Sequence, residues 1–141
     1  MTTSRREQIL SYAATALAGT TQVSSRIYRS RVDAFSREEA PAIVVEPGMD
    51  RAVEFSSCKL DWTLELIIAV YTRGQVPDQL ADPIIVDVNS KLMADRSMGG
   101  LAIDILPAMV DPQRDKADLT SLWTVLTYKV RYRTDQQDLT A

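Results

Sequence analysis

The sequence has no histidine, and Cys58 is its single cysteine among 141 residues. The lack of histidine excludes Ser-His-Asp and Cys-His catalytic arrangements, and it removes the side chain most often used for acid-base chemistry near neutral pH. One thiol cannot form a disulfide within the chain or build a cysteine-rich zinc site. We therefore expect no catalytic residues, no metal site and no cofactor, and we expect Cys58 to be a small buried or half-buried residue.

Long apolar runs and an excess of positive charge are also missing. No apolar stretch approaches the roughly 20 residues of a membrane-spanning helix, which predicts that the protein has no membrane partner. Residues 1–6 lack the apolar stretch of a secretory signal, which favours a cytoplasmic origin. The net charge of -3 argues against a dedicated nucleic-acid binder, whose affinity depends on an excess of Lys and Arg.

What is present is the composition of one ordinary globular domain. A chain of 141 residues with 45% hydrophobic and 25% charged residues can bury a substantial core. We expect a single domain over residues 1–141, with 135–141 as a polar tail.

Two segments have the periodicity of helices. In the first, from about Ser4 to Ala18, Ser4 and Glu7 have the spacing of a capping box. The second covers Pro77 to Asp95, where apolar residues repeat with a period of about 3.6. The sequence leaves open whether this helix begins near Pro77 and bends at Pro83, or begins at Pro83 itself.

Other segments have the alternation or the compact apolar run of strands. Pro47 and Gly48 are expected to end one of them, Pro107 to interrupt another, and Asp111 to Ser121 to form an exposed loop. The segment from Arg51 to Ser57 is a candidate hairpin partner for the long strand that follows it. The expected strands cover Arg26–Val32, Ala42–Val45, Lys59–Tyr71, Leu101–Val110 and Leu122–Thr134.

The two longest expected strands have complementary charges. In Lys59–Tyr71 one face is apolar, whereas the other begins with acidic residues and ends apolar, which predicts cover on that second half by a helix or another subunit. Leu122–Thr134 carries a cationic stripe that ends at Arg133. Antiparallel pairing would place that stripe beside Asp61 and Glu65. The fold class we predict is α+β, with a mainly antiparallel sheet flanked by two main helices.

Pairs of neighbouring carboxylates are the remaining candidates for catalytic groups. Their context matches solvated surface or helix-cap residues, and the loop from Asp111 to Asp118 lacks the spacing of a calcium-binding loop. The pairs are Glu38 with Glu39, Asp78 with Asp82, and Asp111 with Asp115.

Arginines cluster around Tyr28, a pattern that can bind phosphates and stack on bases. In a strand, Arg26 would face one way while Arg29 and Arg31 face the other, so the three would not form one patch. Because arginine is enriched at protein interfaces, we favour an interface role.

Several segments together resemble the phage tail terminator (minor tail protein U-like) family, and the resemblance covers nearly the whole chain. They are Arg26–Arg31 (RIYRSR), Glu39–Glu46 (EAPAIVVE), Leu60–Leu64 (LDWTL), Val76–Pro83 (VPDQLADP), Leu92–Asp95 (LMAD) with Gly99–Leu101 (GGL), and Tyr128–Arg133 (YKVRYR).

The resemblance implies a compact sheet-and-helix domain in a virion, at the junction of head and tail, after assembly in the host cytoplasm. Such proteins form a hexameric ring that stops tail-tube polymerisation and presents a docking surface to the head. The expected partners are other copies of the chain, the tail tube protein and a head-tail connector protein. DNA could pass through the ring without specific recognition.

A ring subunit needs two different surfaces that recognise one another head to tail. We expect Arg26, Arg29, Arg31 and Arg51 on one side, and Glu46, Asp50 and Glu54 on another. The loop from Asp111 to Ser121 would be available for axial contact. The alternatives are another head-tail connector or neck protein, then a hydrolase using two carboxylates, then a nucleic-acid module.

Overall fold

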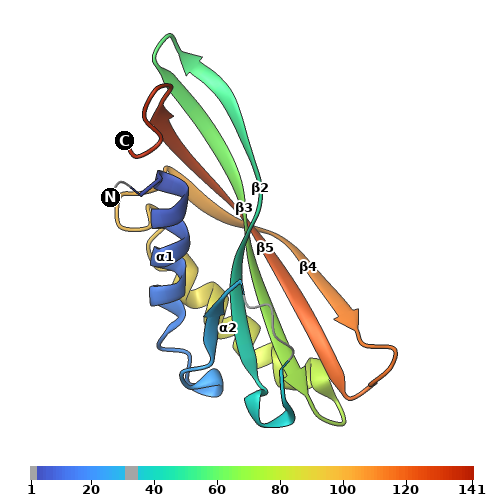
Figure 1. Cartoon of the computed structure of the whole chain (residues 1–141). Coiled ribbons are helices and arrows are strands. Elements are labelled where there is room, and N and C mark those ends of the chain that lie inside the picture. Colours follow the sequence, from blue (N-terminus) through green and yellow to red (C-terminus); the bar gives the residue numbers. More distant parts are fainter. Residues whose placement is uncertain (1–2, 31–34) are drawn as a thin grey trace.

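The computed structural model describes residues 3–30 and 35–141. Its strands form one sheet in the order β1-β2-β3-β5-β4, in which β1 pairs with β2 in parallel and the other neighbours are antiparallel. Both helices pack against the same face of this sheet (Figure 1), which confirms the α+β prediction for a single domain. The elements are α1 (Arg5–Leu17), β1 (Ile27–Arg29), β2 (Ala42–Ser56), β3 (Lys59–Arg73), α2 (Pro77–Met93), β4 (Asp104–Arg114) and β5 (Ser121–Asp135), with 3-10 turns at Thr21–Val23 and Arg37–Glu39.

Helix α1 begins as the sequence predicts. The Ser4 hydroxyl accepts a hydrogen bond from the Glu7 amide at 3.1 Å, which satisfies one of the free N–H groups of the first turn. The Glu7 carboxylate does not complete the capping box, because it binds the Arg29 guanidinium instead. The helix buries Ile9, Leu10, Ala13 and Leu17 against the sheet and α2.

Helix α2 begins at Pro77, which decides between the two starts that the sequence left open. Pro77 occupies the first turn, where a missing N–H costs nothing. Pro83 lies inside the helix on its exposed side. The buried stripe consists of Ala81, Ile84, Val88 and Leu92, as the 3.6-residue period indicates.

Strand β2 is longer than predicted. The expectation that Pro47 and Gly48 end it is wrong, because the ladder with β3 resumes after an irregularity between Pro47 and Asp50. The segment from Arg51 to Ser57 does pair with β3, as predicted, but as the continuation of β2. A Cβ at position 48 would lie 3.0 Å from the Glu65 backbone oxygen, so glycine permits the close approach of the two strands here.

The antiparallel pairing of β3 with β5 confirms the charge-based prediction. Asp61 lies opposite Arg133, and Glu65 lies opposite Lys129. The Arg133 Nε atom donates to Asp61 Oδ1 at 2.6 Å. The cationic stripe of β5 is therefore matched in part within the chain.

Strand β4 differs from its prediction at its end. A register shift between Pro107 and Met109 confirms the interruption, but the strand continues to Arg114. The expected loop from Asp111 to Ser121 is therefore reduced to residues 115–120. Polar residues are tolerated in 111–114 because β4 is an edge strand with exposed side chains. At the other end of the chain, β1 is three residues long, and Arg31 and Val32 lie outside the described residues.

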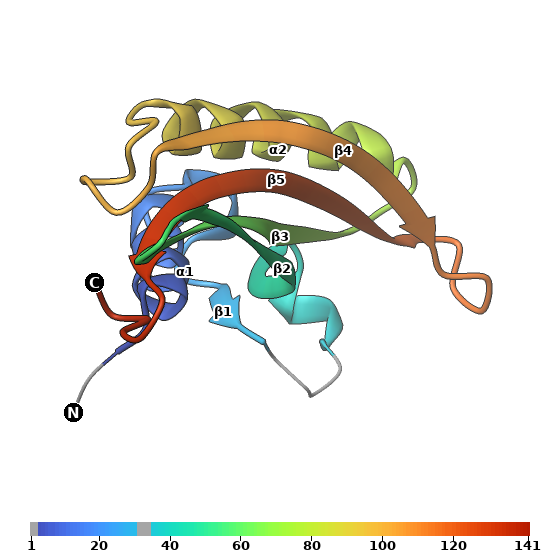
Figure 2. The same ribbon diagram turned by 90° about the horizontal axis from the view of Figure 1, so that it is seen from above.

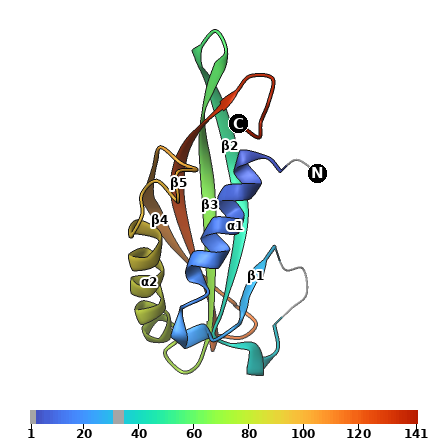
Figure 3. The same cartoon turned by 90° about the vertical axis from the view of Figure 1, so that its left-hand side faces the viewer.

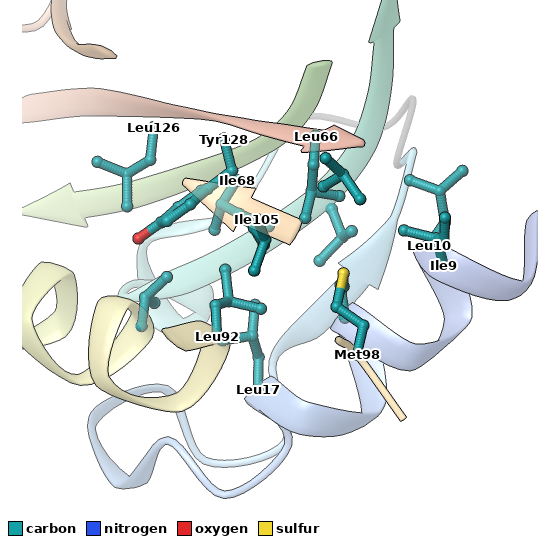
Figure 4. Close-up of a cluster of buried hydrophobic side chains, with 14 of the residues drawn as sticks. Ile9, Leu10, Leu17, Leu66, Ile68, Leu92, Met98, Ile105, Leu126 and Tyr128 are labelled. Carbon is teal, nitrogen blue, oxygen red and sulfur yellow. The ribbon is translucent and has the colours of Figure 1, made fainter. Parts of the chain in front are cut away.

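The core lies between the helices and the sheet face that they cover (Figure 4). Its fully buried side chains include Ile9, Leu17, Leu66, Ile68 and Leu92. Burial of each such side chain contributes about 1.5–3 kcal/mol to folding. The second half of the opposite face of β3 carries an aromatic cluster, and both helices lie on the other face (Figure 4), so the expectation of a helix there is wrong. The members of the cluster are Tyr28, Phe35, Tyr71 and Trp123.

The β2–β3 hairpin extends past the end of α1, away from the helices (Figures 1 and 3). We call residues 49–56 and 59–63 the arm. Cys58 lies in the turn at the tip of the arm and is exposed, so the expectation that it is buried is wrong. The β4–β5 hairpin projects at the opposite end of the curved sheet (Figure 2). The two chain ends lie close together, since the Arg5 amide donates to the Leu139 carbonyl at 2.7 Å.

Candidate functional site

The candidate carboxylate pairs lie at the surface and have local structural contacts. Glu39 Oε1 accepts from the Ser36 amide at 2.9 Å, and Asp115 Oδ1 accepts from the Ala117 amide at 2.9 Å. Asp78 and Asp82 are exposed on α2. Among the described residues, no group of three or more Cys, Asp or Glu side chains could hold a metal ion. The same residues contain no helix with the length and apolar character needed to cross a membrane.

The candidate arginines do not share one surface. Arg29 binds both oxygens of Glu7, at 2.9 and 3.0 Å, so it ties β1 to α1. Arg26 donates from Nε to the Pro41 carbonyl at 2.8 Å. Arg51 is exposed in the arm, where its Nε contacts Met49 Sδ at 2.9 Å. Arg31 lies outside the described residues.

The three candidate acids all lie on β2, together with Arg51. Asp50 is half-buried and accepts a hydrogen bond from the Tyr132 hydroxyl. Glu54 is exposed in the arm, and its Oε2 accepts from the Gln136 side chain at 3.4 Å. Glu46 is half-buried. One strand therefore carries charges of both signs, with Arg51 on one face and Asp50 and Glu54 on the other.

A pocket of about 270 Å³ lies where the arm meets α1. Trp62 and Tyr132 stack in its wall with ring centroids 6.0 Å apart, and Trp62 Nε1 donates to Thr134 Oγ1 at 2.9 Å. Burial raises the pKa of Asp50, against the opposing effects of the Tyr132 hydroxyl and Arg6. Burial also raises the pKa of Tyr132. No described residue donates to the second carboxylate oxygen, Oδ1. Sequence reasoning selected Asp50 for its charge but gave no signal for this pocket.

The sheet face opposite the helices is accessible in the arm, and we call this side the open face. Strand alternation places Met49, Arg51, Val53 and Phe55 in one row on it. Met49, Val53 and Phe55 are 54%, 69% and 56% exposed. The Arg133 guanidinium lies 3.6 Å from the centre of the Phe55 ring, a cation–π contact that orders the ring without covering it. This apolar row was not recognised from the sequence, because it falls in a segment expected to be a simple hairpin partner.

A second apolar surface lies along the edge strand β4. Leu106, Met109 and Val110 are 49%, 56% and 57% exposed. A groove of about 330 Å³ separates this strand from the exposed side of α2, where Val86 is also exposed. The Tyr128 hydroxyl lies under the groove and donates to Asn89 Oδ1 at 3.0 Å, and burial raises the pKa of Tyr128 to about 12. Large exposed apolar surfaces of this kind are typical of interaction sites.

No protein-family model matches this sequence, and no curated protein matches it. A solved structure described as "Virion of native gene transfer agent (GTA) particle" contains a chain of similar fold, with a TM-score of 0.58 and 14% sequence identity. The match covers 93% of this chain and 92% of the other. The chain therefore shares its fold, over nearly its whole length, with a component of a gene transfer agent virion.

Proposed function

We propose that this chain is a structural protein of a phage-like virion, and that it acts there as a ring-forming tail terminator. In this role it caps the tail tube, ends tube polymerisation and provides the surface on which the head docks. The observation that carries the proposal is the nearly full-length similarity in fold to a chain of a gene transfer agent virion. The resemblance of the sequence to tail terminators supports the more specific role.

The surface of the domain is consistent with assembly. Exposed apolar side chains line β2 in the arm and the edge strand β4, which lie on two different edges of the sheet. Two different surfaces that recognise each other head to tail generate a ring when the rotation between copies closes. The proposed partners are further copies of the chain in a hexameric ring, the tail tube protein and a head-tail connector. We place the protein at the head-tail junction of the virion after assembly in the host cytoplasm.

The charged residues selected from the sequence differ in their suitability for such contacts. Arg51 is exposed and makes no ion pair among the described residues, whereas Arg29 is bound to Glu7. Of the acids, Glu54 is exposed but accepts from the Gln136 side chain, while Asp50 is held by Tyr132. We therefore weight Arg51 above Arg26, Arg29, Glu46, Asp50 and Glu54 as a subunit-contact residue.

The test is the solution mass of the purified protein by light scattering across a concentration series, with negative-stain imaging of large species. A ring of about six copies that binds the ends of purified tail tubes supports the terminator role. Rings that bind the portal side of heads, and ignore tube ends, support the alternative of another head-tail connector. A strict monomer that binds neither contradicts both roles.

A further inference from the structure

Two strand edges of the sheet have no strand partner among the described residues. Among the described residues, β1 pairs with β2 only from Ile43 to Val45, and no described strand pairs with the outer edge of β2 from Glu46 to Ser56. The other free edge is the outer edge of β4. The free part of β2 and the whole of β4 have the same length, 11 residues each. Free edges that also carry exposed apolar side chains are sites where a second chain can pack.

The two edges carry matching side chains on the open face. Along the arm the order is Met49, Arg51, Val53, Phe55. On β4 the residues opposite the open-face positions of β5 are, in chain order, Asp104, Leu106, Met109, Asp111 and Gln113. Arg96 binds both carboxylate oxygens of Asp104. Each row therefore has two neighbouring apolar side chains beside one charged side chain without an ion pair in the described chain, and these two charges are of opposite sign.

Both charged groups are available. The Arg51 guanidinium contacts only Met49 Sδ among the interactions of the described residues. Asp111 Oδ2 accepts from the Gln113 side chain at 3.1 Å, and Asp111 makes no ion pair within the described chain. A guanidinium and a carboxylate that each lack an ionic partner can pair across an interface at little desolvation cost, since both are near the solvent.

We propose that the arm of one copy packs antiparallel along β4 of the next copy, with Arg51 beside Asp111. This inference rests on the proposed ring and names the surfaces that close it. The antiparallel alignment that pairs Arg51 with Asp111 also places Val53 on Met109 and Phe55 over Leu106 and Pro107. The parallel alignment would instead place Val53 against Gln113 and leave Phe55 beyond the end of β4. Only the antiparallel alignment buries both apolar rows together with the ion pair.

Side chains carry this contact more than main-chain hydrogen bonds do. Pro107 and Pro112 have no N–H, so a continuous ladder along β4 would be interrupted at two positions. The same prolines protect the free edge from unselective strand pairing. Because the arm surface and the β4 surface differ, the contact is head to tail, and each copy offers one of each to its neighbours.

Charge reversal provides the test. We expect Arg51→Glu and Asp111→Arg each to raise the concentration for half-assembly at least about tenfold, because each creates a like-charge pair at every contact. An equimolar mixture of the two variants should assemble again. In an alternating ring with an even number of copies, every contact in that mixture pairs one acidic with one basic residue.

Glu54→Lys is the matched control, since residue 54 lies on the same strand but on the other face. It should assemble like the unmodified protein. Circular dichroism and thermal unfolding of each variant establish that the exposed substitutions leave the fold intact. In a Cys58→Ser background, a chain with Val53→Cys and Met109→Cys should form disulfide-linked multimers on oxidation, because the proposed alignment brings these positions together.

The outcomes separate this inference from the proposed function. Rings that form equally well with Arg51→Glu and Asp111→Arg overturn the contact and leave the ring standing. Two variants that are each impaired but fail to assemble when mixed also overturn it. An unmodified protein that stays monomeric at every concentration, together with a double-cysteine variant that forms no 53–109 disulfide, overturns the ring and this contact.

Discussion

The same two strands, β2 and β3, run through two regions of very different character. In the body of the domain, their side chains on the covered face pack under α1 and α2, and Ile43, Leu66 and Ile68 have no exposed surface. In the arm, Val53 and Phe55 are more than half exposed, and no helix covers the arm. The body is therefore stabilised mainly by apolar burial. The arm depends on its strand ladder, the Arg133–Asp61 ion pair and the cation–π contact at Phe55.

The difference indicates that one hairpin serves two purposes. Its part in the body of the domain anchors the sheet, whereas the arm presents apolar and charged groups that a monomer leaves exposed to solvent. Natural proteins retain exposed apolar rows mainly where a partner covers them. The following four substitutions test this division of roles, from the largest expected effect to the smallest.

The largest loss of stability should follow Ile68→Ala in the body. Ile68 is fully buried, so the substitution removes apolar contacts and leaves a cavity. We expect the free energy of unfolding to fall by about 2–5 kcal/mol. The measurement is urea denaturation followed by circular dichroism. Val53→Ala in the arm is the control and should change the free energy of unfolding by less than about 0.5 kcal/mol. Equal losses at both positions would show that the arm is part of the core.

A smaller loss should follow Tyr132→Phe at the base of the arm. The Tyr132 hydroxyl is the donor to Asp50, whose other oxygen has no donor among the described residues. Removal of the hydroxyl leaves a half-buried carboxylate without this hydrogen bond, which costs about 1–3 kcal/mol. Tyr128→Phe is the matched control, because its partner Asn89 is exposed and can turn to water. A larger effect for Tyr128→Phe would contradict this account.

Asp50→Asn should alter the pH dependence of stability. Burial raises the pKa of Asp50, so the folded protein holds a proton on this group more tightly than the unfolded chain. The stability that protonated Asp50 contributes is fully present below the pKa of this group in the unfolded chain, and it is lost as pH rises through its pKa in the folded protein. The variant should lack this decline and should be at least as stable as the unmodified protein at pH 7. Denaturation midpoints measured between pH 3 and pH 7 check this, and an unchanged slope would sink the idea.

The smallest effect should come from Asp61→Asn in the arm. The Arg133 guanidinium holds the pKa of Asp61 below its usual range, so this pair contributes above the unfolded pKa and its contribution is lost as pH falls through the folded pKa. Because the pair lies near the solvent, salt screens it. The difference in thermal midpoint between the variant and the unmodified protein should shrink in 1 M NaCl. A difference that persists at high salt would point to packing instead of charge.

Much of the fold could be predicted from periodicity and capping. Ser4 marks the start of α1, the 3.6-residue stripe of α2 is buried, and the antiparallel pairing of β3 with β5 places the cationic stripe beside Asp61 and Glu65. The predictions failed at residues that are typical of turns and loops but that also occur within strands. Pro47 and Gly48 form an irregularity inside β2, and residues 111–114 extend an edge strand. In both places pairing with a neighbouring strand overrides the local tendency to form a loop.

The sequence by itself determined the absence of histidine chemistry, the elements of an α+β domain and the pairing of β3 with β5, because composition, periodicity and charge act locally or between adjacent strands. Only the tertiary structure decided which residues are free for contact. It bound Arg29 to Glu7 and left Arg51 exposed, it placed the half-buried Asp50 beside Tyr132, and it exposed Val53 and Met109 at two edges of one sheet. The reason is physical, since exposure and partnership depend on which segments the fold brings together, and those segments are far apart in the chain.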